Sequence, residues 1–326
     1  MMTLQGNRDW TMTEKQHNIY KNLWEQTHKI FDWRYHHQAN RGNERYRNGV
    51  RAFCKHLAIH YQSKNFKNIN DKHLKSFVKA SNESNISSRT LKTDLAAIRK
   101  LHSMLPKKRY QNLEQNNKKL GVVKRQNIGI DRAWNNNEVD KAIEHAKITD
   151  RNDVKWAIQC ARELGLRIEE TTALTKSQLR EALTNSFIHL TNTKGGIKRD
   201  VPMNSGAERT FRDMIANAPN EKVFTGHGKT HKQVMKSIQN WIYNHRGFFT
   251  ENYSPYVESN RQYQNELNID YERKNLTFHG LRHAYARDQY ESARKRTLDK
   301  KESRRIVANL LGHGRDDVTR IYLAKK

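Results

Sequence analysis

Five short motifs in the second half of the chain contain residue types that can act on a phosphodiester. They are GLRIEE at residues 165–170, TKGG at 193–196, HGLRH at 279–283, LGHG at 311–314 and RIY at 320–322. A guanidinium is planar and permanently charged, and it can bind two phosphate oxygens at once. A tyrosine hydroxyl can attack phosphorus, and lysine and histidine can donate protons. Together the motifs could supply the groups of a phosphoryl-transfer site.

Each motif alone also fits a plain structural role. An arginine near a helix end, as we expect for Arg167, is more often a capping or surface charge, and Lys194 beside two glycines is typical of a hairpin turn. His313 between two glycines fits a solvated helix end, and Tyr322 fits a packing aromatic. Only their joint occurrence in this order favours a shared site.

Taken in order, the motifs resemble the Arg, Lys, His-x-x-Arg, His and Tyr set of the tyrosine recombinases, which include the integrases of phages and other mobile elements. The resemblance covers the chain from about residue 132 to its end, and the first part more loosely. It implies a site-specific DNA recombinase that cuts and rejoins duplex DNA through a 3′-phosphotyrosyl intermediate. It also implies that the reaction needs no metal, no ATP and no other cofactor.

The resemblance makes Tyr322 the nucleophile, and it makes Arg167 and Arg282 the clamp on the scissile phosphate. During transfer, negative charge builds up on the non-bridging oxygens, and two guanidiniums meet it with donors already directed at it. The phosphotyrosine keeps the energy of the broken bond, so the strand can be rejoined to a new partner without ATP.

The departing 5′ oxygen is a poor anion and needs a proton donor. The resemblance assigns this role to Lys194, and Lys198 beyond the glycines is a rival. It places His279 and His313 in the phosphate pocket and makes Glu170 an acid that supports the site.

His279 and His283 are four residues apart, which is also the spacing of two zinc ligands on one helix. Metalloprotease helices carry a glutamate directly after the first histidine, whereas Gly280 follows here, and no third ligand is obvious. Cys54 and Cys160 lie far apart, and neither has a thiol beside it. We therefore expect no metal site, and we assign a role to His279 but none to His283.

Two other functions share part of this pattern. A type IB topoisomerase or a telomere resolvase also uses a nucleophilic tyrosine, but it does not exchange partners between two sites, so a strand-exchange assay separates it from a recombinase. A non-catalytic DNA-binding protein would keep the positive charge and lose the nucleophile. The presence of Tyr322 with both arginines argues against the non-catalytic protein.

The composition favours a nucleic-acid partner. The 326 residues include 61 Lys and Arg against 34 Asp and Glu, for a formal net charge of +27, and 35% are hydrophobic. Cations placed on phosphates release condensed counterions, so this charge suits a polyanion. The sequence shows no signal peptide, long apolar run, lipidation signal or basic amphipathic helix with a large apolar face. We therefore expect a cytoplasmic protein without a membrane partner.

The resemblance also implies the partners and the origin. The partner is double-stranded DNA with inverted-repeat recombination sites, on which four copies of the chain would form a homotetramer across two paired sites. Accessory DNA-bending proteins are a further expected partner. The chain would come from a prokaryotic cell or from a phage, plasmid or transposon.

The elements that must position these residues are mostly helices. Apolar spacing and terminal glycines predict four helices after residue 131: 154–164, 168–174, 234–242 and 306–311. Residues 187–191 and 197–203 read as two strands that pair across the adjacent glycines 195 and 196, with Lys194 at the tip. The fold class is therefore mainly α with a small antiparallel sheet.

The first part of the chain reads as a small helical bundle with basic outer faces. Helices are expected at 50–61, after Asn70, from 87 to 105 and within 8–39. We predict three regions: a helical DNA-binding (core-binding) domain at 1–105, a basic linker at 106–131, and an α+β catalytic domain at 132–326. The linker carries the cations that we expect to touch phosphate: Lys107, Lys108, Arg109, Lys118, Lys119, Lys124 and Arg125.

Overall fold

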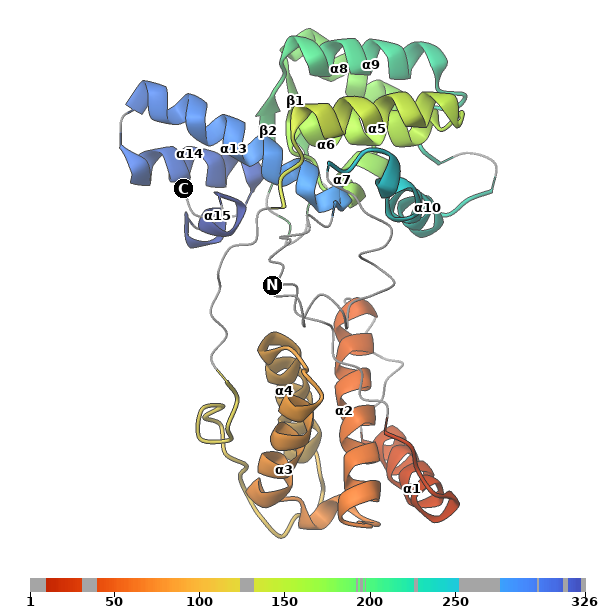
Figure 1. Cartoon of the computed structure of the whole chain (residues 1–326), viewed down its shortest axis with the longest axis vertical. Coiled ribbons are helices and arrows are strands. Elements are labelled where there is room, and N and C mark those ends of the chain that lie inside the picture. Colours follow the sequence, from red (N-terminus) through yellow and green to blue (C-terminus); the bar gives the residue numbers. More distant parts are fainter. Residues whose placement is uncertain are drawn as a thin grey trace. The chain divides into compact units, whose positions relative to one another are not determined.

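The computed structural model divides into two compact units, Met1–Asn127 and Ile128–Lys326, which we describe separately (Figure 1). It describes residues 10–30, 40–123, 132–191, 193, 196, 198–225, 228–251, 276–297, 299–312 and 316–323, with the backbone alone at 40–43 and 316–318. The fold is mainly helical with one two-stranded antiparallel sheet, which confirms the predicted fold class. No helix in the described ranges is long and apolar enough to cross a membrane.

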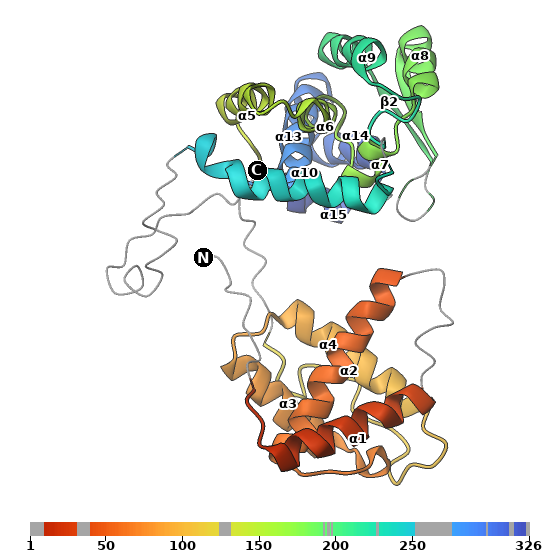
Figure 2. The ribbon, with the colours of Figure 1, turned by 90° about the vertical axis from the view of Figure 1, so that its right-hand side faces the viewer.

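The first unit is a bundle of helices, coloured red to orange in Figures 1 and 2. Its α-helices are α1 (Glu14–Ile30), α2 (Asn40–His60), α3 (Asp71–Glu83) and α4 (Ser88–Ser103). The predicted Asn70 cap begins α3, where its side chain accepts a hydrogen bond from the Lys72 amide, and Ser87, which was predicted to lie in the helix, caps α4 by accepting one from the Thr90 amide. The apolar faces of these helices enclose a core that includes Phe53.

Part of the predicted linker 106–131 belongs to the first unit. Leu113, Leu120 and Val122 are buried in the core of that unit. The Glu114 amide donates to Asp71 Oδ1 at 2.7 Å, and its carbonyl accepts from Arg99 Nη2 at 2.6 Å. Residues 106–123 are therefore packed against the core of the first unit and are not a free linker. The sequence did not predict this burial because the apolar side chains of the segment follow no regular spacing.

The second unit surrounds α6 (Asn152–Leu164), which packs against α5, α9 and α13. The other α-helices and the strands in its described ranges are α5 (Asn136–Ile148), α7 (Ile168–Thr172), α8 (Lys176–Asn185), β1 (Phe187–Leu190), β2 (Arg199–Pro202), α9 (Ser205–Asn217), α10 (His231–His245), α13 (Phe278–Thr297), α14 (Lys300–Leu311) and α15 (Asp316–Leu323). Strands β1 and β2 pair with Phe187 opposite Pro202 and Leu190 opposite Arg199, as the hairpin pattern predicts.

Two glycines end helices that border the site. Gly165 has φ 62° after α6, and Gly312 has φ 64° after α14, so both adopt the left-handed conformation that glycine favours. A Cβ on Gly165 would lie 2.3 Å from the Tyr285 ring, so the end of α6 can approach α13 only with glycine there.

Candidate active site

The elements that carry the predicted catalytic residues converge at one end of α13. Arg167 is the residue directly before α7, whereas His279 and Arg282 lie in the first turns of α13 and Tyr322 lies in α15. Helices α13, α14 and α15, the blue helices of Figures 1 and 2, pack against one another. The fold therefore brings residues more than 150 positions apart in the sequence into one cluster.

Arg282 is fully buried and ties two helix ends together. Its Nη1 donates to the Gly165 carbonyl and its Nη2 donates to the Leu311 carbonyl. These carbonyls lie at the C-terminal ends of α6 and α14, where the helix dipole favours a cation. Burial, followed by the charge of Arg167, lowers the Arg282 pKa to about 10, so its guanidinium stays charged at neutral pH.

Arg167 reaches the same helix end as Arg282. Its Nη2 donates to the Leu311 carbonyl at 3.3 Å, and its Nη1 donates to Glu170 Oε1 at 2.7 Å. The Arg167 amide donates to Glu170 Oε2 at 2.8 Å, so Glu170 also accepts a backbone hydrogen bond at the start of α7. The shared Leu311 carbonyl thus holds both predicted phosphate-binding guanidiniums near each other.

Glu170 is the buried acid between the arginines, and it also binds Arg199, a residue to which the sequence analysis assigned no role. Arg199 Nη1 donates to Glu170 Oε1 at 2.9 Å, and Arg199 Nη2 donates to Oε2 at 2.7 Å. Burial raises the Glu170 pKa, but the hydrogen bonds and charges of Arg199 and Arg167 outweigh burial and hold the pKa at about 2. A sequence signal for Arg199 exists, since it alternates with buried Val201 on β2 and therefore faces inward.

Tyr322 packs into the same cluster and is 5% exposed. Its ring stacks on His283 with centroids 4.4 Å apart, lies 5.4 Å from the His279 ring, and has Arg282 Cζ 5.9 Å from its centroid. His279 is itself exposed, so it borders both the tyrosine and solvent. The structure therefore brings Arg167, Glu170, His279, Arg282 and Tyr322 together.

His283, to which the sequence analysis gave no role, supports the tyrosine. Its ring is hydrogen-bonded to the Tyr322 backbone, and burial, followed by the charge of His279, lowers its pKa to about 3. The ring is therefore neutral at physiological pH. Within the described ranges, no group of three or more His, Cys, Asp or Glu side chains could hold a metal ion, so the alternative zinc pair His279 and His283 has no further ligand there.

Some predicted site residues cannot be placed. Lys194 and His313, as well as Lys124 and Arg125 of the basic set, lie outside the described residues. The rival Lys198 is exposed just before β2. The other basic residues of the predicted linker lie on the first unit, where all are exposed except half-buried Lys108: Lys107, Lys108, Arg109, Lys118 and Lys119.

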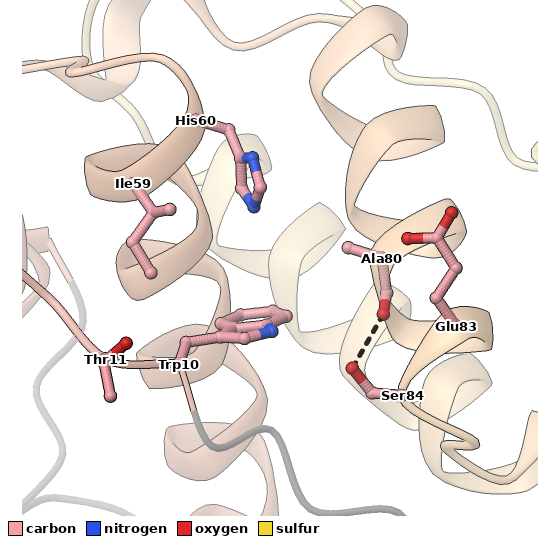
Figure 3. A pocket seen from close by; sticks show the side chains of 7 residues that line it. All are labelled: Trp10, Thr11, Ile59, His60, Ala80, Glu83 and Ser84. Carbon is pink, nitrogen blue, oxygen red and sulfur yellow. Dashed lines mark hydrogen bonds between the residues drawn. The ribbon is translucent and has the colours of Figure 1, made fainter.

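The first unit also has a small surface hollow, shown in Figure 3. It is lined by Trp10, Thr11, Ile59, His60, Ala80, Glu83 and Ser84. The Ser84 hydroxyl in its wall donates to the Ala80 carbonyl at 2.9 Å. Because none of the predicted catalytic residues lines this hollow, we assign it no part in the chemistry.

Two family models match the chain. The model described as the phage integrase family matches residues 133–326, and the model described as the phage integrase N-terminal SAM-like domain matches residues 39–109. A comparison with curated proteins finds no match.

Several solved structures have a similar fold at low sequence identity. A lambda integrase dimer bound to a COC′ core site has a TM-score of 0.60 at 13% identity, over 97% of this chain and 82% of that one. The Tn1549 transposon integrase with circular intermediate DNA has a TM-score of 0.59 at 14% identity, over 94% and 95%. The XerH site-specific recombinase bound to difH has a TM-score of 0.53 at 16% identity, over 96% and 93%. These likenesses show the fold of the chain.

Proposed function

The chain belongs to the phage integrase family and is a site-specific DNA recombinase, and we propose that it acts by attack of Tyr322 on a scissile phosphodiester. The observation that carries the proposal is the position of the Tyr322 ring beside His279 and Arg282 of the same chain. A nucleophile and a phosphate clamp in one cluster are what a covalent phosphoryl transfer needs.

In the proposed reaction, the Tyr322 oxygen bonds to phosphorus while the bond from phosphorus to the 5′ oxygen breaks. The DNA is then attached to the chain through its 3′ phosphate. His279 accepts the tyrosine proton, and Lys194 donates a proton to the departing 5′ oxygen. Attack by the 5′ hydroxyl of another strand on the phosphotyrosine reverses these steps and releases Tyr322.

Arg167 and Arg282 bind the non-bridging oxygens in this proposal. Their charges and N–H groups stabilise the negative charge of the transition state. In other phosphoryl transferases a metal ion stabilises this charge. His313 adds a further hydrogen bond to the phosphate, and Glu170 holds Arg167 in place through a hydrogen bond. On this chemistry, cleavage proceeds without a divalent ion and without ATP.

The proposed partner is duplex DNA with inverted-repeat sites, and the proposed assembly is a homotetramer on two paired sites. The net charge of +27 and the DNA in the lambda, Tn1549 and XerH complexes support a DNA partner. We assign DNA binding to the N-terminal domain and catalysis to the C-terminal domain, with accessory DNA-bending proteins as further partners. The setting would be the cytoplasm of a prokaryotic cell or of the host of a mobile element.

Covalent trapping tests the proposal. Duplexes that the purified chain selects from a random pool are rebuilt with a nick beside the cleavage position, so that the released fragment cannot return. We expect a DNA–protein adduct on a denaturing gel, which forms equally in the presence of a chelator and is absent in Tyr322→Phe. Two selected sites should also exchange strands, whereas relaxation of supercoils without exchange would indicate a topoisomerase. Binding without any adduct would overturn the proposal.

A further inference from the structure

Arg199 stands out because it is a buried arginine that none of the motifs predicts. It is 7% exposed, and its two terminal nitrogens meet the two oxygens of Glu170 at 2.9 and 2.7 Å. Such fork-to-fork pairing is the strongest arginine–carboxylate geometry. Two buried charges still lose their hydration, and apolar residues of similar size are often as stable. Stability alone is therefore a weak account of this pair.

The surroundings of Arg199 connect it to the elements that hold the candidate clamp. A Cβ on Gly312 would lie 3.1 Å from the Arg199 side chain, so Arg199 packs against the end of α14. The adjacent Leu311 carbonyl is the one that accepts from both Arg167 and Arg282. Arg199 itself comes from β2, so one side chain links β2 to α7 and α14.

The charges around Glu170 show what Arg199 adds. Glu170 lies 2.7 Å from Arg167 and 3.9 Å from Arg282, so its carboxylate faces both arginines of the clamp. The three arginines and one carboxylate carry a net charge of +2, which suits a phosphate whose charge grows during transfer. Without Arg199 the net charge would fall to +1, and Glu170 would compete with the phosphate for Arg167.

We propose that Arg199 is a positioning residue for strand cleavage. Its positive charge balances the negative charge of ionised Glu170 and its two hydrogen bonds hold the carboxylate in place, so that Arg167 and Arg282 remain available to the scissile phosphate. The assignment of Arg199 rests on the proposed function. Both terminal nitrogens of Arg199 donate to Glu170, so we assign Arg199 an action through Glu170 and no contact of its own with the phosphate.

The test measures single-turnover formation of the covalent adduct on the nicked duplex at saturating protein. Arg199→Met should slow adduct formation by about 10- to 100-fold, by analogy with the loss seen when the hydrogen-bond partners of metal-ligating residues are removed. DNA affinity in a band-shift assay should change little, because both terminal nitrogens of Arg199 already bind Glu170. Arg199→Lys keeps the charge and loses the fork, so its rate should lie between those of wild type and Arg199→Met.

The double variant Arg199→Met with Glu170→Gln tests most directly whether Arg199 acts by balancing the charge of Glu170. It removes both charges of the pair and restores the net charge of +2, so its rate should exceed that of Arg199→Met alone. Glu170→Gln alone controls for a general gain from removing a negative charge, and it should not exceed wild type. Arg151→Met removes another bidentate pair of the same unit, with Asp153 at 2.8 and 2.9 Å, and should leave the rate unchanged.

The outcomes distinguish failure of this inference from failure of the proposed function. If the wild-type chain forms no adduct that depends on Tyr322, both fail together. If wild type forms the adduct and Arg199→Met reacts at the same rate, the role of Arg199 is wrong and the proposed function stands. The same holds if Glu170→Gln brings no recovery to Arg199→Met, because neutralisation of Glu170 is then not what Arg199 provides. Thermal unfolding of every variant checks the fold, and Arg199→Lys keeps the test valid if Arg199→Met unfolds.

Discussion

At the scale of single residues, the candidate site depends on the buried residues that hold the predicted catalytic side chains as much as on those side chains themselves. Glu170 accepts hydrogen bonds from Arg167 and Arg199, and it stays ionised across the neutral and mildly acidic range because its pKa is held at about 2. His283 supports Tyr322 in the same way, through a ring stack and a hydrogen bond to the tyrosine backbone. These buried partners fix the rotamers of the groups that would do the chemistry.

The buried neutral state of His283 predicts an acid-sensitive fold. Its pKa in the folded chain is about 3, below the ordinary 6.5, so protons bind the unfolded chain more tightly. The contribution of His283 to stability is complete above pH 6.5 and is lost as the pH falls toward 3. His283→Phe keeps the stack and cannot bind a proton. We expect its free energy of unfolding to fall less steeply with decreasing pH, by up to about 1.4 kcal/mol per pH unit.

Urea unfolding between pH 7 and pH 4 provides the measurement. His60→Phe is the matched control, because His60 is exposed and its substitution should leave the slope of wild type nearly unchanged. Parallel pH curves for wild type and His283→Phe would mean that His283 is not held neutral in the folded chain.

The family resemblance predicted the residues assigned to the phosphate and the supporting acid Glu170, but it gave no role to Arg199 or His283. The resemblance to the tyrosine recombinases assigned Arg167, His279, Arg282 and Tyr322 to one site, and the structure brings these residues together. Arg199 and His283 differ because their roles depend on which side chain lies across from them, and a single sequence does not reveal that partner.

At the scale of elements, the ends of α6 and α14 matter more than their lengths. Their last carbonyls receive Arg282, and the left-handed Gly165 makes the first of these contacts possible. Gly165→Ala would place a methyl group 2.3 Å from the Tyr285 ring, in addition to the cost of about 1 kcal/mol for a left-handed alanine. We expect a loss of about 2–4 kcal/mol in the free energy of unfolding.

Gly228→Ala separates the two causes of that loss. Gly228 has φ 74°, and no atom lies within 4 Å of a Cβ placed there, so this variant should lose only the conformational part. Chemical unfolding of both variants measures the difference. Equal losses would mean that α13 moves aside without cost and that the close approach of α6 to α13 is not a constraint.

Local patterns predicted part of the fold, whereas helices α5, α8, α9, α13 and α15 were not predicted from the sequence. The paired strands β1 and β2, the Asn70 cap and the glycine ends of α6 and α14 follow from local rules, and all are present. Helix α13 was missed because its first half is buried almost all round, from Gly280 to Ala286, so it has no polar face to create a period.

At the scale of the whole molecule, the excess of 61 basic over 34 acidic residues should determine how tightly the chain holds DNA. Log affinity should fall linearly with log salt, with a slope of about −0.9 per phosphate neutralised. Lys118→Ala with Lys119→Ala removes two exposed cations of the first unit and should reduce the slope by about 1.8 if both touch phosphate.

Fluorescence anisotropy of a labelled duplex across a salt series measures this slope. Lys147→Ala is the control, because Lys147 is an exposed cation of the second unit outside the predicted basic set, and its substitution should leave the slope unchanged. If the double variant keeps the wild-type slope, these two lysines do not contact the phosphates. The DNA path on the first unit would then involve other cations.

The most direct test of the account is to identify the residue that carries the DNA in the trapped adduct. The chain has 13 tyrosines, and trypsin cleavage after Arg320 and Lys325 isolates Ile321–Lys325, in which Tyr322 is the only tyrosine. After nuclease and protease digestion, mass spectrometry should find the 3′-phosphonucleotide on this peptide alone. A nucleotide on any other tyrosine, or on a serine or histidine, would contradict the assignment of Tyr322 and of the cluster built around it.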